Sequence, residues 1–501
     1  MNMLRTGLIL VLLSMFSLPG NAQLNTAAFD AFIKAQYERF QLPSISVAIV
    51  KDGDVILKSN YGARSREATQ APDPNTLYAI ASLSKAFTAA SIGMLVDDGK
   101  LRWDDKVVDH LPWFSMHDPY VTQHMTIEDL LCHRSGLITF DGDLLWYGST
   151  YTRKEAVKRI RFRAPTHEFR SDFGYQNLMF MTAGEVIEAV SGMTWDEFVA
   201  QRILKPLKMS RTTSSFQAFS TDFNIAKPHL NGEQIFMLSY DNSGATAALN
   251  SSTGDMSKWI QFWLNKGIIG DDTLLSQASV DKIWTLHTPL ELGNFDTENG
   301  IQDKGYGQGW FLMNYNGDKV VHHGGGLPGY ISKIAMVPEE RLGIIVLTND
   351  MSSVPTMLMY AAIDWAKGKE YAKWSDTFYT FKESGKTREI EAAEKRLETK
   401  KDDPLLLPLE DYIGTYIDEM YGEAEVTMGK DGLILSLLPA KELFTGKMTV
   451  WNDHAFRFEV NDPFLPFGVA TFEVERDVVQ GFMIDLPNYD FHFDKLNFRR
   501  K

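Results

Sequence analysis

Cysteine is almost absent from this chain. A single cysteine, Cys132, stands among 501 residues. One thiol excludes an intramolecular disulfide, so stability has to come from a packed core. Cys132 is followed by His133, but neighbouring residues of a helix do not face each other. We therefore interpret Cys132 as a buried structural thiol and not as half of a thiol–histidine pair.

An excess of positive charge is also missing. The chain carries 50 lysines and arginines against 65 aspartates and glutamates, a formal net charge of -15. Such an acidic balance disfavours nucleic-acid binding. The length and a hydrophobic fraction of 44% are enough for a large core, and they favour two domains.

Long apolar runs are confined to the start of the chain. Residues 1–22 contain one basic residue, Arg5, then an apolar segment from 8 to 18, and small residues before Gln23. This pattern is typical of a secretory signal cleaved after Ala22, so we expect a periplasmic or secreted protein. No cysteine follows the apolar segment, and no later run approaches the length of a membrane span, so we expect no membrane anchor.

The order of the expected elements indicates one large α/β unit. Residues 45–50 and 55–60 flank Asp52-Gly53, which predicts a hairpin. Helical periodicity follows at 82–98, 126–132, 153–163, 177–190, 194–203 and 254–265. Strand patterns return at 307–315, 319–323, 330–337 and 342–347. Because strands stand at both ends of a helical middle, both ends are expected to complete one sheet.

The C-terminal quarter has a different character. Lysine and glutamate dominate residues 366–404, and a charged run ending at Pro404 breaks any helix, so we expect a charged, partly helical linker. Short strand-like runs follow at 412–416, 423–428, 433–437, 455–460, 468–475 and 478–484. They predict a separate small β domain over 405–501, after a main domain over 23–365.

The tetrapeptide Ser82-Leu83-Ser84-Lys85 is the first candidate for chemistry. It stands where a short apolar run meets a helical pattern, so Ser82 falls at a helix start and Lys85 lies on the same face, about 5–6 Å away between Cβ atoms. A serine attacks only when a base takes its proton, so the pKa of Lys85 would have to fall by about 3 units. The same tetrapeptide also arises from an N-cap serine followed by a solvated lysine.

Tyr175-Gln176-Asn177 is the second candidate, just before the helical pattern that begins at 177. A turn here can direct the tyrosine hydroxyl and the asparagine amide into a cleft. The hydroxyl could relay protons near Lys85, and the amide could bind both Lys85 and a substrate carbonyl. A buried tyrosine with a satisfied hydroxyl is the alternative.

The third candidate is a strand that ends in glycines, His322-His323-Gly324-Gly325-Gly326. Consecutive glycines let another backbone or a substrate approach closely. The adjacent histidines point to opposite faces of a strand, and no carboxylate stands at ligand spacing, so we predict no metal and no cofactor.

Together, Ser-x-x-Lys, then Tyr-x-Asn about ninety residues later, then His-x-Gly on a late strand resemble the serine β-lactamase and penicillin-binding protein superfamily. The likeness runs from about residue 28 to 365. It is closest to the class C β-lactamase-like branch, which includes esterases, D-amino-acid peptidases and DD-peptidases. Supporting phrases lie at 80–85, 126–137, 306–310 and 323–329. The tail, at 481–493, is similar to a β-barrel-like domain appended to such hydrolases.

The resemblance implies a fold and a set of roles. The fold would be an antiparallel sheet flanked by helices, with an all-helical subregion and a small C-terminal all-β domain. Ser82 would form the acyl-enzyme, Lys85 and Tyr175 would share the acid and base roles, and Asn177 would orient Lys85 and the substrate. Which of Lys85 and Tyr175 takes the serine proton stays open.

The same resemblance implies where the substrate would bind. The backbone N–H groups of Ser82 and Gly326 would form the oxyanion hole. His323 and Gly325 would belong to the strand that binds the substrate. The expected partner is a small molecule or a peptide.

The third motif departs from the family pattern. Penicillin-directed members usually carry Lys-Thr-Gly where this chain has His323-Gly324-Gly325. A histidine is a weaker anchor for the carboxylate of a β-lactam. We therefore expect an exported serine hydrolase acting on a small ester, amide or D-amino-acid-containing peptide. A penicillin-binding protein or β-lactamase and a non-catalytic envelope binding protein are the alternatives.

Overall fold

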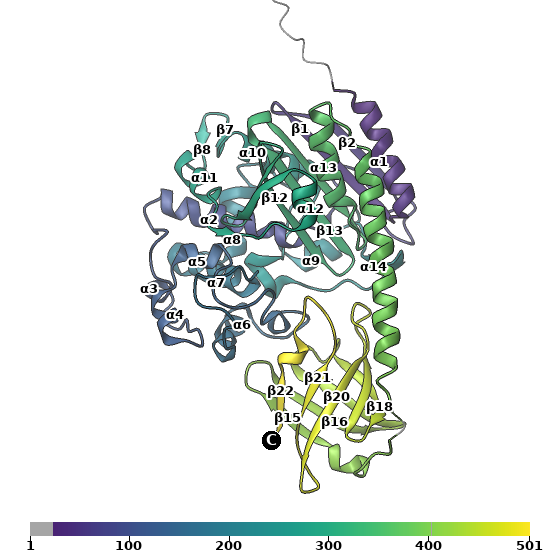
Figure 1. Ribbon diagram of the computed structural model, residues 1–501. Helices are drawn as coiled ribbons and strands as arrows, with labels where there is room; N and C mark the ends of the chain where they lie inside the picture. Colours follow the sequence, from purple (N-terminus) through teal and green to yellow (C-terminus); the bar gives the residue numbers. More distant parts are fainter. Residues whose placement is uncertain (1–23, 402) are drawn as a thin grey trace, which may run out of the picture.

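The computed structural model describes residues 24–401 and 403–501. Figure 1 shows a large part built of helices and strands and, joined to it by one long helix, a barrel. The predicted fold class is confirmed: a large antiparallel sheet is flanked by helices, and a closed β-barrel follows it. The expected signal sequence at 1–22 lies outside the described residues.

Helices contribute more residues than strands to the described chain before the barrel. In chain order they are α1 (Thr26–Phe40), α2 (Ser84–Asp97), α3 (Val107–His110), α4 (Pro119–His124), α5 (Ile127–Leu131), α6 (Arg153–Arg159), α7 (Asn177–Ser191), α8 (Trp195–Val199), α9 (Phe216–Ser220), α10 (Thr253–Leu264), α11 (Gln277–Ile283), α12 (Asn294–Glu298), α13 (Val354–Ala366) and α14 (Lys373–Leu397).

The strands alternate with these helices and then form the barrel. They are β1 (Ser44–Lys51), β2 (Asp54–Gly62), β3 (Tyr78–Ala79), β4 (His229–Leu230), β5 (Glu233–Gln234), β6 (Asn250–Ser251), β7 (Ile268–Ile269), β8 (Asp272–Thr273), β9 (Thr288–Pro289), β10 (Ile301–Tyr306), β11 (Phe311–Tyr315), β12 (Asp318–Leu327), β13 (Tyr330–Val337), β14 (Leu342–Thr348), β15 (Gly414–Asp418), β16 (Gly422–Gly429), β17 (Gly432–Leu437), β18 (Thr445–Asn452), β19 (Ala455–Val460), β20 (Gly468–Glu475), β21 (Val478–Asp485) and β22 (Asn497–Arg500).

The central sheet joins the two ends of the large unit, as the sequence predicts. Its strand order is β2-β1-β14-β13-β12-β11-β10-β9, and β1 pairs antiparallel with β14. The predicted hairpin is β1–β2, in which Lys51 pairs with Asp54. One face of the sheet packs against α1 and α13, and the other face packs against the cluster that contains α2 and α10.

The strand predicted at 307–315 is shorter than expected. Residues 307–309 form a turn between β10 and β11, and Gly309 has a φ of 72°. A left-handed backbone of this kind cannot continue a strand. Apolar residues on both sides of the turn gave a continuous strand pattern, so the sequence predicted one longer strand.

The charged segment at 366–404 is largely helical. Its first turns belong to the core, because Trp374 is fully buried and stacks on Tyr360 at 4.6 Å between ring centroids. The indole of Trp374 also donates to Asp364 at 2.8 Å. The later turns are mostly exposed, and α14 ends at Leu397, before the break predicted at Pro404.

The barrel closes in the order β15 to β22, with β22 pairing back onto β15. Aromatic rings pack its interior: Phe472 lies 5.0 Å from Tyr412 and 5.2 Å from Phe482 between centroids. An eight-stranded barrel is just wide enough for side chains to fill it. The barrel therefore has a packed core of its own.

The single cysteine is buried in the fold. Cys132 is buried, its thiol donates to the carbonyl of Glu128 at 3.0 Å, and burial raises its pKa. The prediction of a structural thiol agrees with this environment. Among the described residues no helix combines the length and the apolar character needed to cross a membrane.

Candidate active site

Ser82 stands on a single 3-10 turn, Ala81–Leu83, directly before α2. The preceding residue, Ala81, is buried and has a φ of 50°, which is rare for a residue with a side chain. Such a conformation costs on the order of 1 kcal/mol or more and persists only where the surroundings impose it. The turn therefore holds Ser82 at a fixed place, two residues earlier than the start of α2.

Lys85 lies beside Ser82, as the spacing of the motif predicts. Its Nζ is 3.0 Å from the Oγ of Ser82, 2.7 Å from the Oδ1 of Asn177 and 3.3 Å from the carbonyl oxygen of Thr246. The side chain is fully buried, and this burial lowers the pKa of Lys85 to about 7. The fold thus supplies the pKa shift that the sequence alone could only require.

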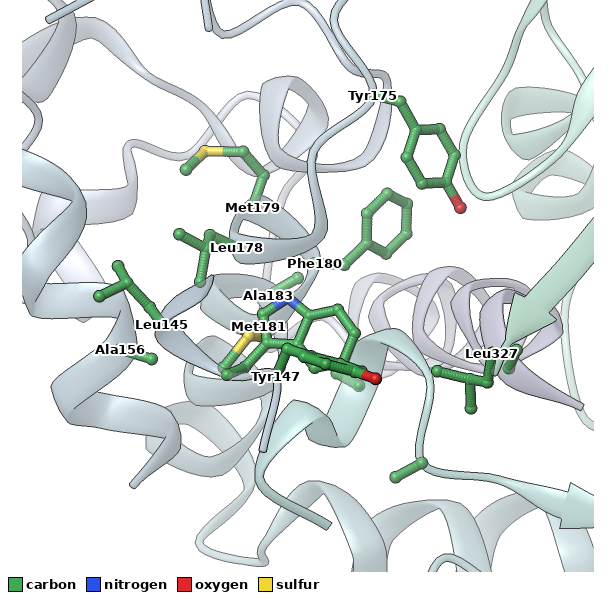
Figure 2. Packing of buried hydrophobic residues seen from close by; sticks show 14 of the residues in the cluster. Leu145, Tyr147, Ala156, Tyr175, Leu178, Met179, Phe180, Met181, Ala183 and Leu327 are labelled. Carbon is green, nitrogen blue, oxygen red and sulfur yellow. The ribbon is translucent and has the colours of Figure 1, made fainter. Parts of the chain in front are cut away.

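Tyr175 and Asn177 reach the same place from the start of α7. The Nζ of Lys85 lies 4.7 Å from the centre of the Tyr175 ring. Burial raises the pKa of the Tyr175 hydroxyl, although the nearby Ser82 hydroxyl opposes the rise. Figure 2 shows the side chains of Tyr175 and Phe180 on one side of α7, with the hydroxyl pointing away from the helix. The second predicted motif therefore meets the first.

His133 is a neighbour of the site that the sequence reasoning did not select. Its ring centroid lies 4.1 Å from that of Tyr175 and 4.4 Å from that of Tyr306. Its Nδ1 accepts the backbone N–H of Gln176 at 2.9 Å, and burial lowers its pKa far below the usual value. His133 is thus a neutral support for the Tyr175 segment. It lies inside the phrase 126–137, but nothing in that phrase alone indicates this packing.

The glycines of β12 bring this strand against the turn that carries Ser82. A Cβ added at Gly325 would lie 2.2 Å from the carbonyl oxygen of Ile80 and 2.4 Å from the Oγ of Ser332. Ser332 in turn donates to the same Ile80 carbonyl at 3.0 Å. Gly326, the next residue, is exposed. The third predicted motif therefore forms one edge of the same site.

Comparison with known proteins decides the family. A family model described as Beta-lactamase matches residues 29–365, which is more than half of the chain. This chain belongs to the Beta-lactamase family. A second model, described as a domain of unknown function (DUF3471), matches residues 398–500 and so covers the barrel. Membership supports a general serine hydrolase role.

Two curated relatives of this Beta-lactamase family member illustrate the range of similarity. Unguisins hydrolase ungD' of Aspergillus campestris is 29% identical over 356 residues, which are 67% of this chain and 64% of the relative. Protein flp of Staphylococcus aureus (strain MW2) is 26% identical over 369 residues, which are 71% of this chain and 69% of the relative. The chain thus spans about two thirds of the length of each relative.

Solved structures share the fold over 95% of this chain. The octameric penicillin-binding protein homologue from Pyrococcus abyssi aligns with a TM-score of 0.63 and 22% identity, covering 95% of this chain and 99% of that one. The crystal structure of SurE aligns with a TM-score of 0.54 and 17% identity over the same shares. At these identities the likeness shows the fold alone.

His323, in the third motif of this Beta-lactamase family member, is enclosed by protein. Its Nδ1 donates to the carbonyl of Gly324 at 2.6 Å, and its Nε2 lies 2.9 Å from the hydroxyl of Tyr306. The side chain is 1% exposed, and burial lowers its pKa to about 3. A neutral ring with both nitrogens occupied cannot offer a positive charge to a substrate.

A loop over residues 138–147 holds the Tyr175 segment from outside. The backbone N–H of Tyr175 donates to the Oγ1 of Thr139 at 3.1 Å, and the N–H of Phe140 donates to the carbonyl of Tyr175 at 2.8 Å. Asn177 donates to Asp143 at 2.6 Å. The loop therefore fixes the positions of both candidate residues of the second motif.

The barrel holds this loop on its other side. The ring of Tyr147 packs on Phe491 at 4.2 Å between centroids, and its hydroxyl donates to the buried Asp462 at 2.7 Å. His492 reaches the carbonyl oxygen of Thr139 at 2.8 Å from its Nε2. The barrel thus contacts the loop that supports the candidate active site.

Replacing Gly325 with alanine is expected to damage both stability and activity. The new methyl group would meet backbone at 2.2 Å, so β12 or the Ser82 turn must shift. Overpacking of this kind costs about 1–3 kcal/mol in the free energy of unfolding, and a displacement of about 1 Å costs on the order of 10²-fold in rate. Gly324→Ala is the matched control, because its Cβ would have no neighbour closer than 3.8 Å. Thermal unfolding and kcat/KM of both variants check the prediction, and equal behaviour would contradict it.

Replacing Phe491 with alanine is expected to weaken the contact between barrel and loop. Phe491 is 4% exposed, and truncation of a buried phenylalanine costs about 3–5 kcal/mol. Because the loop over 138–147 also holds Tyr175, we expect kcat/KM to fall about 10-fold or more. The neighbouring Tyr489 is 96% exposed, so Tyr489→Ala should leave both quantities unchanged. Full activity in a destabilised Phe491→Ala protein would show that the loop keeps its shape without the barrel contact.

Proposed function

We propose that this protein is a serine hydrolase that forms an acyl-enzyme on Ser82 and hydrolyses a small ester, amide or D-amino-acid-containing peptide. One observation carries the proposal. The Oγ of Ser82 lies 3.0 Å from the amine of a fully buried lysine whose pKa burial lowers to about 7. A nucleophile within hydrogen-bond reach of a base that is partly neutral at physiological pH is what acyl transfer requires.

In the proposed mechanism Lys85 is the base of the acylation step. The Ser82 proton moves to the Nζ of Lys85 while the Oγ electron pair forms the bond to the substrate carbonyl carbon. Tyr175 keeps its proton at neutral pH, because burial raises its pKa. It can therefore hand that proton to the leaving group, and Lys85 returns its own proton to Tyr175. Water then attacks the ester on Ser82 and releases the acid.

Two backbone N–H groups are proposed to bind the oxyanion. They belong to Ser82, on the 3-10 turn, and to Gly326, at the exposed end of β12. The close approach of Gly325 to the Ile80 carbonyl brings these two backbones together. Each such donor contributes about 3 kcal/mol to transition-state stabilisation.

The proposed substrates are esters, amides or peptides in preference to β-lactams. A β-lactam presents a carboxylate, and the neutral, enclosed His323 supplies no positive charge for it. We infer that His323 holds β12 in place through Tyr306 and does not touch the substrate. The name of the Aspergillus relative, unguisins hydrolase, fits a hydrolytic role. The pattern of residues 1–22 supports the further proposal that the protein acts outside the cytoplasm.

Intact-protein mass spectrometry tests this function. The protein is incubated with a panel of p-nitrophenyl esters, D-amino acyl amides and β-lactams, quenched with acid, and weighed beside Ser82→Ala. We expect a mass increase equal to an acyl group from an ester or amide, located on Ser82 by peptide mapping. Adducts formed only by β-lactams would favour a penicillin-binding protein. No adduct from any member of the panel, together with no turnover, would overturn the proposal.

A further inference from the structure

Asp143 is a buried carboxyl group directly behind the candidate site. It begins a 3-10 turn, Asp143–Leu145, in the loop over 138–147, and it is 3% exposed. Its Oδ2 accepts the side-chain N–H of Asn177 at 2.6 Å. Its Oδ1 is buried and has no hydrogen-bond partner within 3.5 Å in the part of the chain that the structure describes, although the indole of Trp146 lies near enough to lower the pKa of the carboxyl. A buried carboxyl with a free oxygen is costly and calls for a functional explanation.

The contact with Asp143 determines how the Asn177 amide is turned. Above a pH of about 8, where Asp143 is ionised, its carboxylate accepts hydrogen bonds only, so it requires the NH2 side of the amide. The amide oxygen then faces the amine of Lys85, at 2.7 Å. One continuous chain of hydrogen bonds therefore links Ser82, Lys85, Asn177 and Asp143.

Asp143 differs from the other titratable groups near Lys85 in its effect on the pKa of Lys85. It is the carboxyl group whose negative charge raises the pKa of Lys85, against the larger lowering effect of burial. His133 and His323 also lie near Lys85, but burial lowers the pKa of both, so both are neutral at pH 7. Tyr175 stays protonated.

Asp143 itself faces a small number of charged or polar groups. Burial raises its pKa to about 8, and the Asn177 amide and the Trp146 indole oppose that rise. The charge of Lys85 lowers its pKa, and the charge of Asp490, from the barrel, raises it. Lys85 and Asp143 therefore each act on the pKa of the other.

We propose that Asp143 is a positioning residue that holds the Asn177 amide with its oxygen toward Lys85 and stabilises the ammonium group formed when Ser82 gives up its proton. This role rests on the proposed function of Ser82 and Lys85. During the step the proton leaves Ser82 and arrives on Lys85, and the serine electron pair forms the new bond. Asp143 neither gains nor loses a proton in this step, and above a pH of about 8, where it is ionised, its charge acts through Asn177.

The role has a cost in stability. Because its folded pKa is raised, Asp143 binds its proton more tightly in the folded protein than in the unfolded chain. The stability associated with that proton is present below a pH of about 4 and is lost as the pH rises toward 8. A neutral residue of the same shape should therefore stabilise the fold at pH 8.

The variant Asp143→Asn tests the proposal, with a fluorophosphonate as the probe. The rate of Ser82 labelling is measured from pH 5 to 10 in the wild type and the variant, beside thermal unfolding at pH 8. We expect labelling to slow by about 10-fold, because the neutral carboxamide of the variant holds the Asn177 amide less strongly than an ionised carboxyl does. We also expect the acid limb of the profile to move to lower pH, because the variant lacks the carboxyl group whose negative charge raises the pKa of Lys85. The unfolding temperature should stay the same or rise.

Asp141→Asn is the matched control in the same loop. Asp141 is equally buried, but its carboxylate pairs with Arg163 at 2.8 Å and contacts neither Asn177 nor Lys85 in the described hydrogen bonds. The variant leaves the partly buried Arg163 without its charged partner, so the unfolding temperature should fall while the acid limb stays in place.

The outcomes separate this role from the proposed function. A wild type that the probe does not label at Ser82 would overturn the proposed function, and the role of Asp143 with it. A labelled wild type beside an equally fast Asp143→Asn would overturn the role of Asp143 alone. Slower labelling with an unmoved acid limb and a lower unfolding temperature would also overturn it, since this is what a purely structural residue produces.

Discussion

Replacing Ser82 with alanine is expected to reduce kcat by on the order of 10⁵- to 10⁶-fold and to abolish every covalent adduct. The change removes the oxygen that would carry the acyl group, and loss of a nucleophile in other serine hydrolases has effects of this size. Ser82 is partly exposed, and its Oγ contacts Lys85, so the fold should remain intact. Steady-state kinetics on the best substrate of the panel, with circular dichroism as the fold check, measures the effect.

Ser84 offers a control within the same motif. Its Oγ donates to the carbonyl of Ala81 at 2.7 Å and accepts the N–H of Leu249 at 3.1 Å, away from Lys85. Ser84→Ala should cost about 1–3 kcal/mol in the free energy of unfolding, because a buried N–H loses its partner. It should keep adduct formation on Ser82. If Ser84→Ala abolished the adduct and Ser82→Ala did not, the nucleophile would have been placed on the wrong serine.

Local sequence patterns were enough to predict most of the fold and the three segments that form the candidate site. The β1–β2 hairpin follows from two apolar runs around Asp52-Gly53, and the joining of both ends in one sheet follows from the order of strands and helices. The proximity of Ser82 and Lys85 needs only helical spacing. These features depend on residues that are near in sequence, so the chain alone predicts them.

The features that sequence did not predict depend on contacts between distant segments. Asp143 precedes Asn177 by 34 residues, and only the folded loop over 138–147 brings the two together. The substrate-binding role of His323 stays a prediction, and the sequence could not show that Tyr306 and Gly324 occupy both of its nitrogens. The alternation of side chains along a strand does not show which polar side chain forms hydrogen bonds inside the protein.

Contacts between residues that are distant in sequence also join the barrel to the candidate site. The strand pattern predicts a separate β domain, and a packed barrel is present. The contact between Phe491 and Tyr147 appears only in the folded chain, as does the influence of Asp490 on Asp143. The barrel therefore contributes to the electrostatics of the large unit while keeping its own core.

Replacing Lys85 with methionine is expected to reduce kcat/KM by about 10³- to 10⁴-fold, because general base catalysis contributes up to about 10⁴-fold and the serine loses its nearest proton acceptor. The pH profile gives the sharper test. A lysine acts as a base only when neutral, so with a pKa of about 7 the wild-type kcat/KM should rise as the pH increases through 7. Methionine fills a similar volume without a titrating group, so the rise in kcat/KM near pH 7 should disappear in Lys85→Met.

Tyr175→Phe distinguishes the two candidate bases. Because burial raises the pKa of Tyr175, this residue is protonated throughout the range in which Lys85 titrates. If Lys85 takes the serine proton, Tyr175→Phe should slow turnover of amides, whose leaving group needs a proton, and keep the rise near pH 7. Esters with a p-nitrophenolate leaving group should be affected much less. Loss of the pH 7 limb in Tyr175→Phe, with its retention in Lys85→Met, would transfer the role of base to Tyr175.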